Sequence, residues 1–163
     1  MDEVADIFGG GTPARNEAAY WGGDIPWVTP TDLPMPGEGI AEIADTSEHI
    51  NRTGLESCAA TLVPPGSVLF SSRATIGKLG IARVSLTTNQ GFVNLVPKKC
   101  VESKFLAYCL LYFTDDVARL AGSTTFKEVT RGNFRGFRIP MPAPSEQWRI
   151  PPAVSHSPAA CSG

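Results

Sequence analysis

The middle of the chain alternates short apolar runs with turn residues, a pattern typical of a β-sheet. The runs at 67–71, 79–84 and 91–96 are rich in Val, Leu, Ile and Phe, and Gly, Pro or Asn stand between them. We therefore predict strands at these three places, joined by tight turns. Shorter strands are expected at 25–29, 62–63 and 75–76.

The spacing of apolar residues changes after residue 101. Apolar side chains recur there every three to four positions, which predicts a buried helical face over 101–121 that ends at Gly122. The residues of this face are Phe105, Leu106, Cys109, Leu110, Phe113, Val117 and Leu120. The same spacing joins Val4 to Ile7 and Phe8, so a short helix is expected over 2–8, ended by the glycine run at 9–11.

Proline and glycine interrupt the remaining segments. Residues 34–39 and 140–144 are predicted to be irregular. A short turn or helix is expected within 45–57, a loop and short strand at 123–129, and a basic loop and strand at 131–139. Strands followed by a helix on one side indicate a loop-rich α+β domain, with a twisted, mostly antiparallel or mixed sheet and one or two packed helices.

The size and composition fit one domain. The chain has 163 residues, 42% of them hydrophobic, and carries 16 glycines and 14 prolines. No apolar run approaches the roughly 18 residues needed to span a bilayer, and no secretory signal is recognisable, so a soluble, cytoplasmic protein is expected. The four cysteines include no Cys-x-x-Cys pair and there are two histidines, so we expect free thiols and no metal site.

Charge is distributed unevenly along the sequence. The first 51 residues carry ten acidic residues and a single base, Arg15, whereas residues 52–138 carry twelve bases and five acids. This polarity suggests an anionic partner for the basic part, although a solvated basic face remains the alternative.

The motifs do not match catalytic ones. The run Gly9–Pro13 could cradle an anion, but the Gly-x-x-x-x-Gly-Lys-Ser/Thr pattern of nucleotide-binding loops is missing, and a helix stop feeding a shaped loop is the other interpretation. No Gly-x-Ser-x-Gly occurs, and Pro64-Pro65 stands between Val63 and Gly66 rather than in the Asn/Asp-Pro-Pro-aromatic motif of adenine methyltransferases. We expect no catalytic residue and no cofactor.

Cations and amides near predicted turns are the candidate binding residues. Ser71, Ser72, Arg73 and Lys78 bracket one turn, where Arg73 could contact a guanine edge or a phosphate and Lys78 a phosphate. A solvated hairpin is the alternative. Asn89 and Gln90 could pair with adenine, or could instead hold a turn.

Two loops complete the candidate surface. The segments 29–38 and 123–135 are the expected places for base-reading residues. The candidates in the second segment are Lys127, Arg131, Asn133 and Arg135, and an ordinary exposed basic loop is the alternative. Trp21 and Trp27 are expected to pack in the core, with stacking on bases as the other possibility.

Taken in order, these motifs resemble the target-recognition domain of the specificity subunit of type I restriction–modification systems. The resemblance covers residues 1–150. It is carried by the ordered set Gly9–Pro13, Tyr20–Trp27, Ser71–Lys78, Thr88–Phe92, Ile139–Pro142 and Glu146-Gln147. It implies that the chain reads one half of a bipartite duplex DNA target. It also implies that a modification subunit methylates adenine and that a restriction subunit, joined through it, cleaves.

The last residues depart from that family. The resemblance implies a long spacer helix after Ile150, but Pro151 and Pro152 disfavour a helix there. Residues 151–163 are therefore expected to be a disordered or truncated tail. A non-catalytic protein-interaction module, or an inactive truncated remnant, is the alternative function.

Overall fold

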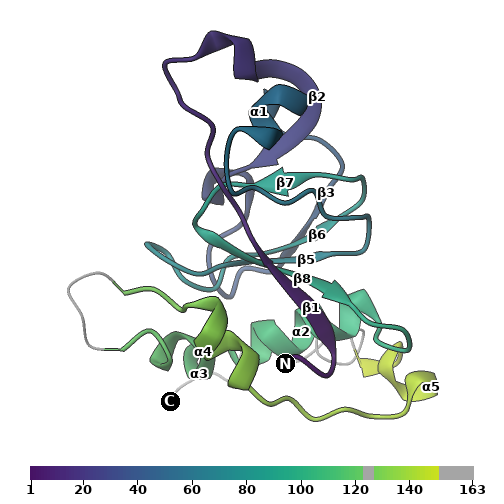
Figure 1. Cartoon of the computed structure of the whole chain (residues 1–163). Coiled ribbons are helices and arrows are strands. Elements are labelled where there is room, and N and C mark those ends of the chain that lie inside the picture. The colour runs from purple at the N-terminus through teal and green to yellow at the C-terminus, as the bar shows by residue number, and fades with distance from the viewer. Residues whose placement is uncertain (123–126, 151–163) are drawn as a thin grey trace.

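The protein is built on a five-stranded sheet that is buried on both faces, which explains why its strands read as almost continuous apolar runs. A computed structural model describes residues 1–122 and 127–150 (Figure 1). The strands in spatial order are β1 (Ala5–Gly9), β8 (Phe92–Pro97), β5 (Val68–Ser71), β6 (Leu79–Ala82) and β3 (Ile40–Ile43). The first four strands pair antiparallel with one another, and β3 pairs parallel with β6.

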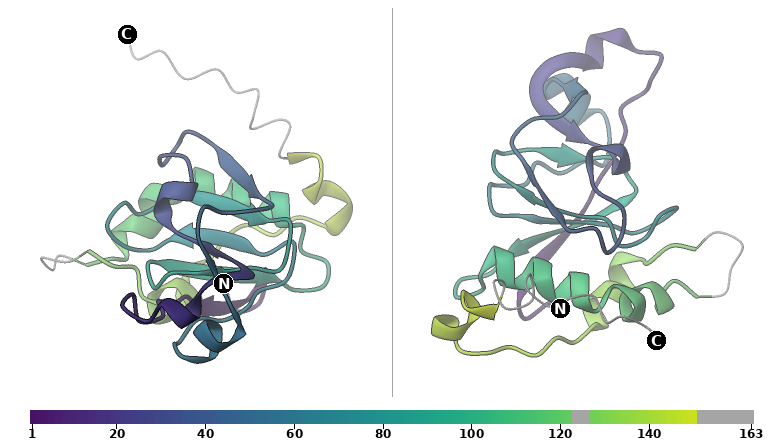
Figure 2. Two further views of the ribbon diagram at one scale, coloured as in Figure 1. Left: turned by 90° about the horizontal axis from the view of Figure 1, so that it is seen from above. Right: turned by 180° about the vertical axis from the view of Figure 1, so that it is seen from behind.

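Helices cover one face of this sheet. They are α2 (Ser103–Tyr112), α3 (Thr114–Arg119) and α4 (Arg131–Gly136), which lie below the sheet together with the short α5 (Pro144–Gln147) (Figures 1 and 2). Alternate strand residues such as Phe70 and Leu95 point into this core, where Phe70 meets Phe134 edge to face at 5.3 Å. The packing fixes α4 against the sheet next to β1.

A smaller three-stranded sheet lies over the opposite face. It contains β4 (His49–Ile50), β2 (Trp21–Val28) and β7 (Thr87–Thr88), in that order. The other elements of this part are the single-turn segments η1 (Ala18–Tyr20) and η2 (Pro30–Asp32) and the helix α1 (Arg52–Glu56). Trp27, Ile50 and Leu55 form a separate small core beneath α1.

The predicted fold class is confirmed: the chain is an α+β protein with mixed sheets. The three main predicted strands correspond to β5, β6 and β8, and the one at 25–29 overlaps β2. The helical face expected over 101–121 is also present, as α2 and α3 separated at Phe113.

The helix predicted over 2–8 is wrong. Residues 5–9 form β1, which pairs antiparallel with β8. Ile7 contributes to the helix-side core whereas Phe8 packs on the opposite side of the sheet, which is the two-residue period of a strand. Three apolar residues were too few to distinguish the helical period from the two-residue period of a strand, and pairing with β8 makes this segment a strand.

The strand predicted within 131–139 is also wrong. Residues 131–136 form α4, whose first turn is capped by Thr130, because its hydroxyl accepts a hydrogen bond from the backbone N–H of Asn133 at 3.1 Å. This cap was present in the sequence as Thr-x-x-Asn, but two glycines in the helix concealed it.

The smaller elements differ as well. Residues 75–76 form a turn rather than a strand, Val63 makes only an isolated bridge to Leu86, and β3 was not foreseen. The expectations for residues 123–126 and for the tail 151–163 lie outside the described residues. Within the described ranges, no helix is long and apolar enough to cross a membrane.

Candidate nucleic-acid interface

Several motifs that are distant in sequence meet at one end of the five-stranded sheet. β1 ends, β8 begins and β5 ends there, with Gly9 opposite Val93 and Ser71 opposite Phe92. The N–H of Ser72 donates to the carbonyl of Gly91 at 2.8 Å, and the carbonyl of Ser72 accepts from the N–H of Val129 at 2.8 Å. These pairings bring together four segments, 9–12, 71–73, 89–91 and 127–131, which we call the strand-end surface.

Two arginines lie on glycines at this surface. A Cβ placed on Gly91 would lie 3.6 Å from Nε of Arg73, and one placed on Gly9 would lie 3.5 Å from Cζ of Arg131. Arg73 is half-buried and Arg131 is exposed, and neither forms an ion pair with another described residue. Within the described residues, both guanidinium groups therefore lack an acidic partner.

Further charges lie beside the two arginines. Lys127 is exposed and also lacks an ion pair within the described ranges. Glu128, whose backbone bridges to Arg73, is the acidic residue of the strand-end surface. Three bases against one carboxylate make this end of the sheet cationic.

The turn before β8 carries two amide side chains, those of Asn89 and Gln90, which have different roles. Asn89 accepts the N–H of Gly91 on its side-chain oxygen at 2.9 Å, and its own N–H donates to the carbonyl of Val28 at 2.9 Å. Asn89 thus shapes the turn, as the structural interpretation of this motif expected. Gln90 is exposed, and its side-chain amide oxygen accepts a hydrogen bond from the hydroxyl of Thr12.

The glycine run at 9–11 allows close backbone contact. A Cβ on Gly10 would lie 1.8 Å from the carbonyl oxygen of Asn89, and one on Gly11 would lie 2.4 Å from the backbone nitrogen of Ala60. The N–H of Gly11 donates to the carbonyl of Thr88 at 2.9 Å. In this structure the glycines join the loop to β7 and the turn after it, rather than forming an open anion cradle.

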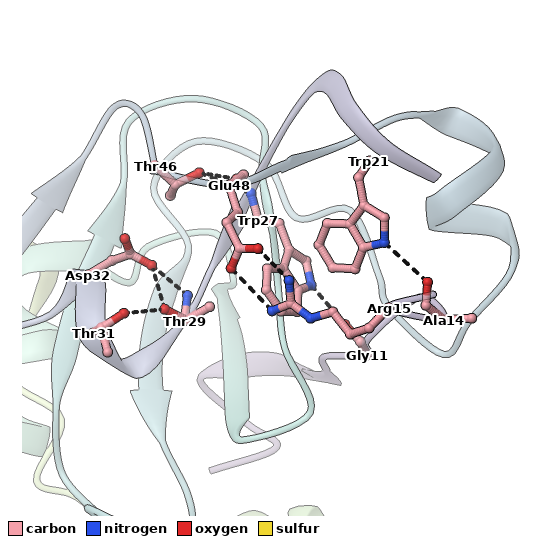
Figure 3. Close-up of polar contacts among 10 residues, drawn as sticks. All are labelled: Gly11, Ala14, Arg15, Trp21, Trp27, Thr29, Thr31, Asp32, Thr46 and Glu48. Atoms are coloured by element: carbon pink, nitrogen blue, oxygen red, sulfur yellow. Dashed lines mark hydrogen bonds and ion pairs between the residues drawn. The ribbon is translucent and has the colours of Figure 1, made fainter. Parts of the chain in front are cut away.

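Arg15 lies at the C-terminal end of the loop 11–15 and holds it against two tryptophans (Figure 3). Its guanidinium carbon lies 4.2 Å from the ring centre of Trp21 and 4.6 Å from that of Trp27. The two indoles meet edge to face at 5.0 Å, and the carboxylate of Glu48 accepts hydrogen bonds from both terminal nitrogens of Arg15. The hydrogen bond from Arg15 lowers the pKa of Glu48 and raises that of Arg15.

Three of the candidates from the 71–78 turn are directed away from the surface. Ser71 and Ser72 are buried, and the Ser71 hydroxyl donates to the carbonyl of Thr75 at 2.6 Å and accepts from the N–H of Lys78 at 2.8 Å. The Lys78 ammonium donates to the carbonyls of Pro30 at 2.6 Å and Leu33 at 3.2 Å. These three side chains therefore point into the protein, unlike Arg73.

The segment 29–38 is bound by its own side chains. Asp32 accepts hydrogen bonds from the N–H of Thr29 at 2.7 Å and from its hydroxyl at 2.9 Å (Figure 3), and Glu38 accepts from the N–H of Met35 at 3.1 Å. The segment contains acids and no base. Its charge does not extend the cationic surface.

The last two candidates lie further along α4. The side-chain amide of Asn133 donates to the carbonyl of Leu120 at 2.8 Å, just after α3. Arg135 lies 3.7 Å from the carboxylate of Asp2. Asn133 thus links α3 to α4, and Arg135 is partly neutralised.

Folding also mixes the charges that the sequence keeps apart. Acids of the first 51 residues pair with later bases: Glu42 with Arg83 and Lys104, and Asp6 with Lys98. The bases at the strand-end surface are among those left without an acidic partner in the described part of the chain. The sequence polarity therefore overstates the size of the basic surface.

Sequence reasoning missed three residues of this region. Thr12 contacts Gln90, and Arg15 anchors the loop that carries Thr12. Asn94 is fully buried in β8, and its side-chain NH₂ donates to the hydroxyl of Thr88 at 2.8 Å, whereas its side-chain oxygen has no hydrogen-bond partner among the described residues. Two signals could have found them: an amide inside the apolar run 91–96, and the single base of an acidic segment beside two tryptophans.

No group of three or more His, Cys, Asp or Glu side chains suited to a metal ion occurs among the residues placed by the structure.

The sequence matches the family described as the type I restriction modification DNA specificity domain over residues 1–152. It is 36% identical to the type I restriction enzyme MjaIX specificity subunit of Methanocaldococcus jannaschii, over 96% of this chain and 36% of that protein. It is 28% identical to the EcoprrI specificity subunit of Escherichia coli, over 88% of this chain and 36% of that protein. The chain thus spans about a third of the length of the curated relatives it matches.

Solved structures share the fold. A chain from a study of complex assembly and conformational transition of a type I restriction–modification system superposes with a TM-score of 0.71, at 25% identity, covering 95% of this chain and 36% of that one. The HsdS subunit of Thermoanaerobacter tengcongensis gives a TM-score of 0.67 at 23% identity, covering 94% of this chain and 34% of that one.

Proposed function

Because the chain belongs to the type I restriction modification DNA specificity domain family, we propose that it recognises duplex DNA for a type I restriction–modification system. Residues 1–150 would form one target-recognition domain that reads one half of a bipartite site. Adenine methylation would be carried out by a modification subunit, and cleavage by a restriction subunit that joins through it. The chain itself would contribute recognition and no catalysis.

The observation that carries this proposal is the strand-end surface. Arg73 comes from a segment distant in sequence from the one that carries Lys127 and Arg131, yet all three lie at one end of the sheet without an acidic partner among the described residues. Unpaired cations on one rigid edge suit a polyanion, because each phosphate contact releases condensed counterions. Gln90 supplies a directional amide beside them.

These groups divide naturally by chemistry. Arginine can bind two acceptors of a guanine edge or of a phosphate at once, whereas lysine acts on phosphate as a point charge. We assign Arg73, Lys127 and Arg131 to phosphates that border the major groove, where either arginine could also reach a guanine edge, and Gln90 to a hydrogen-bond acceptor beside them. Asn89, Ser71, Ser72 and Lys78 would support the surface rather than touch DNA, and Asn133 and Arg135 would lie at its margin.

Salt-dependent binding to duplex DNA tests the proposal. The full chain is expected to bind at about 50 mM salt, with log affinity falling linearly as log salt rises. Replacing Arg73, Lys127 and Arg131 together by Gln should reduce the magnitude of that slope by about 2–3, since each phosphate contact contributes about 0.9.

A matched variant controls for net charge. Lys98, Lys99 and Lys104 follow the opposite end of β8 or lie at the start of α2, and their replacement by Gln removes the same charge. This control should change the slope by less than about 1. Equal slopes for the two triple variants, or no binding of the unmodified chain at low salt, would overturn the proposal.

One observation favours a protein-interaction function as the second candidate. An apolar groove of about 500 Å³ lies between α2 and the segment 140–150. Tyr112, which is 75% exposed, and Met141, which is 42% exposed, lie on it. Such a groove suits a protein partner better than phosphate, and it would be the primary site if the chain fails to bind duplex DNA.

A further inference from the structure

Arg15 differs from the other bases of the chain in how its charge is used. It is the single base of the first 51 residues, and Glu48 neutralises it. Two indole rings also lie against its guanidinium group (Figure 3). A cation with its charge and its planar face both occupied is poorly placed to bind phosphate, so its role lies in what it holds.

The indoles that hold Arg15 also hold the loop before it. Nε1–H of Trp27 donates to the carbonyl of Gly11 at 2.9 Å, and Nε1–H of Trp21 donates to the carbonyl of Ala14 at 3.1 Å. Trp27 is 1% exposed and is therefore fixed by the core. The loop 11–15 is thus attached at its first and fourth residues to the same pair of rings on which Arg15 lies.

The loop ends at the strand-end surface. Thr12 follows Gly11 directly, and its hydroxyl donates a hydrogen bond to the side-chain amide oxygen of Gln90. The Gln90 oxygen is therefore turned to the protein, and its NH₂ group is left for an external hydrogen-bond acceptor. Gly11 also donates to the carbonyl of Thr88, whose hydroxyl is held by the buried Asn94.

We propose that Arg15 is a positioning residue for DNA recognition: through its stack with Trp21 and Trp27 it holds the loop 11–15 so that Thr12 orients the Gln90 amide toward DNA. This inference rests on the proposed function. The group on DNA that the amide meets is a hydrogen-bond acceptor, either a phosphate oxygen or the N7 and O6 edge of guanine.

A double-mutant cycle tests the link from Arg15 to Gln90. Gln90→Ala should weaken duplex binding about fivefold, the loss expected for one hydrogen bond. Arg15→Met should weaken it by a similar factor, and the double variant should be weakened about fivefold rather than the roughly 25-fold of independent effects. Arg15→Lys keeps the charge beside Glu48 but not the planar stack, and should fall between Arg15→Met and the unmodified chain.

The salt slope separates positioning from direct contact. Arg15→Met should leave the slope unchanged, whereas loss of a phosphate contact would reduce its magnitude by about 0.9. Binding to methylphosphonate-substituted duplexes, and to duplexes with 7-deazaguanine, identifies which acceptor the Gln90 amide meets. In either case the sensitivity to that replacement should disappear in Gln90→Ala.

Four outcomes decide the matter. Coupled effects with an unchanged slope support the inference, whereas additive effects, or an Arg15→Met variant that binds like the unmodified chain, overturn it. Failure of the unmodified chain to bind duplex DNA would instead defeat the proposed function. If Arg15→Met does not fold, as judged by circular dichroism, the same cycle is run with Arg15→Lys, which keeps the charge beside Glu48 but not the planar stack, and additivity again overturns the inference.

Discussion

Gly10 is the position where the structure predicts the sharpest response to a single added methyl group. A Cβ there would lie 1.8 Å from the carbonyl oxygen of Asn89 and 2.4 Å from the hydroxyl oxygen of Thr88. The first of these is backbone of a turn that is itself hydrogen-bonded to β2, so it cannot rotate away. The loop would have to move outward by more than 1 Å in Gly10→Ala.

The cost of that movement has two parts. Overpacking of a closed contact costs about 1–3 kcal/mol. Losing the hydrogen bond from Gly11 to Thr88 adds about 0.5–1.5 kcal/mol, since that 2.9 Å contact depends on the same approach. Gly10→Ala is therefore expected to lower the free energy of unfolding by about 1.5–4.5 kcal/mol.

Urea unfolding followed by tryptophan fluorescence measures this loss. Gly132→Ala is the matched control, because the nearest atom to its Cβ would be 3.7 Å away and alanine favours the helix α4. The control should be neutral or stabilising by up to about 1 kcal/mol. A loss below about 0.5 kcal/mol for Gly10→Ala would refute the close approach of the loop to the turn, on which the placement of Gln90 depends.

Three further predictions concern Lys78, Glu48 and Cys109. Lys78→Met should lower the free energy of unfolding by about 1–3 kcal/mol and leave the salt slope of DNA binding unchanged, because its ammonium binds two carbonyls; a reduced slope would make Lys78 a phosphate contact. The lowered pKa of Glu48 means that its pairing with Arg15 stabilises the fold fully above the ordinary pKa of 4.5. This stabilisation is lost as the pH falls through the lower folded value, so a tryptophan fluorescence change on acidification should be absent in Glu48→Gln. Burial raises the pKa of Cys109 to about 11, so at pH 8 it should react with a thiol reagent far more slowly than the exposed Cys100, measured in a background without the other two cysteines; equal rates would contradict the burial.

The central strands could be predicted because their signal is local and strong. β5, β6 and β8 lie in runs where nearly every residue is apolar, since both sheet faces are buried. β1 could not be predicted, because its conformation depends on pairing with β8 almost 90 residues later. α4 was missed for a different reason: Gly132 and Gly136 argue against a helix, and packing of Phe134 against Phe70 outweighs that propensity.

The candidate site divides along similar lines. A sequence identifies which residues carry a charge, but not which of these charges remain available to bind an external partner. Arg73 and Lys78 looked equivalent as cations at one turn, yet Lys78 is bound by two backbone carbonyls from the segment 30–33 and Arg73 is not. Those carbonyls belong to a segment more than 40 residues away in sequence, so only the fold separates the two side chains.

The same contacts explain why motifs that identify this family need not encode a DNA sequence. The characteristic groups of these motifs contact other parts of the same chain. They are the missing Cβ of Gly10, the indole N–H of Trp27 and the short polar side chains of Asn89 and Ser71. The groups left over for an external partner project from this framework at its edge. A substitution among those outward groups is therefore expected to change affinity or sequence preference at nearly constant stability. A substitution in the framework should lower both the stability and the affinity for DNA. Arg15 is the decisive case between these classes, because it touches only the framework and yet, by the argument from Thr12 and Gln90, should alter recognition in a chain that remains folded.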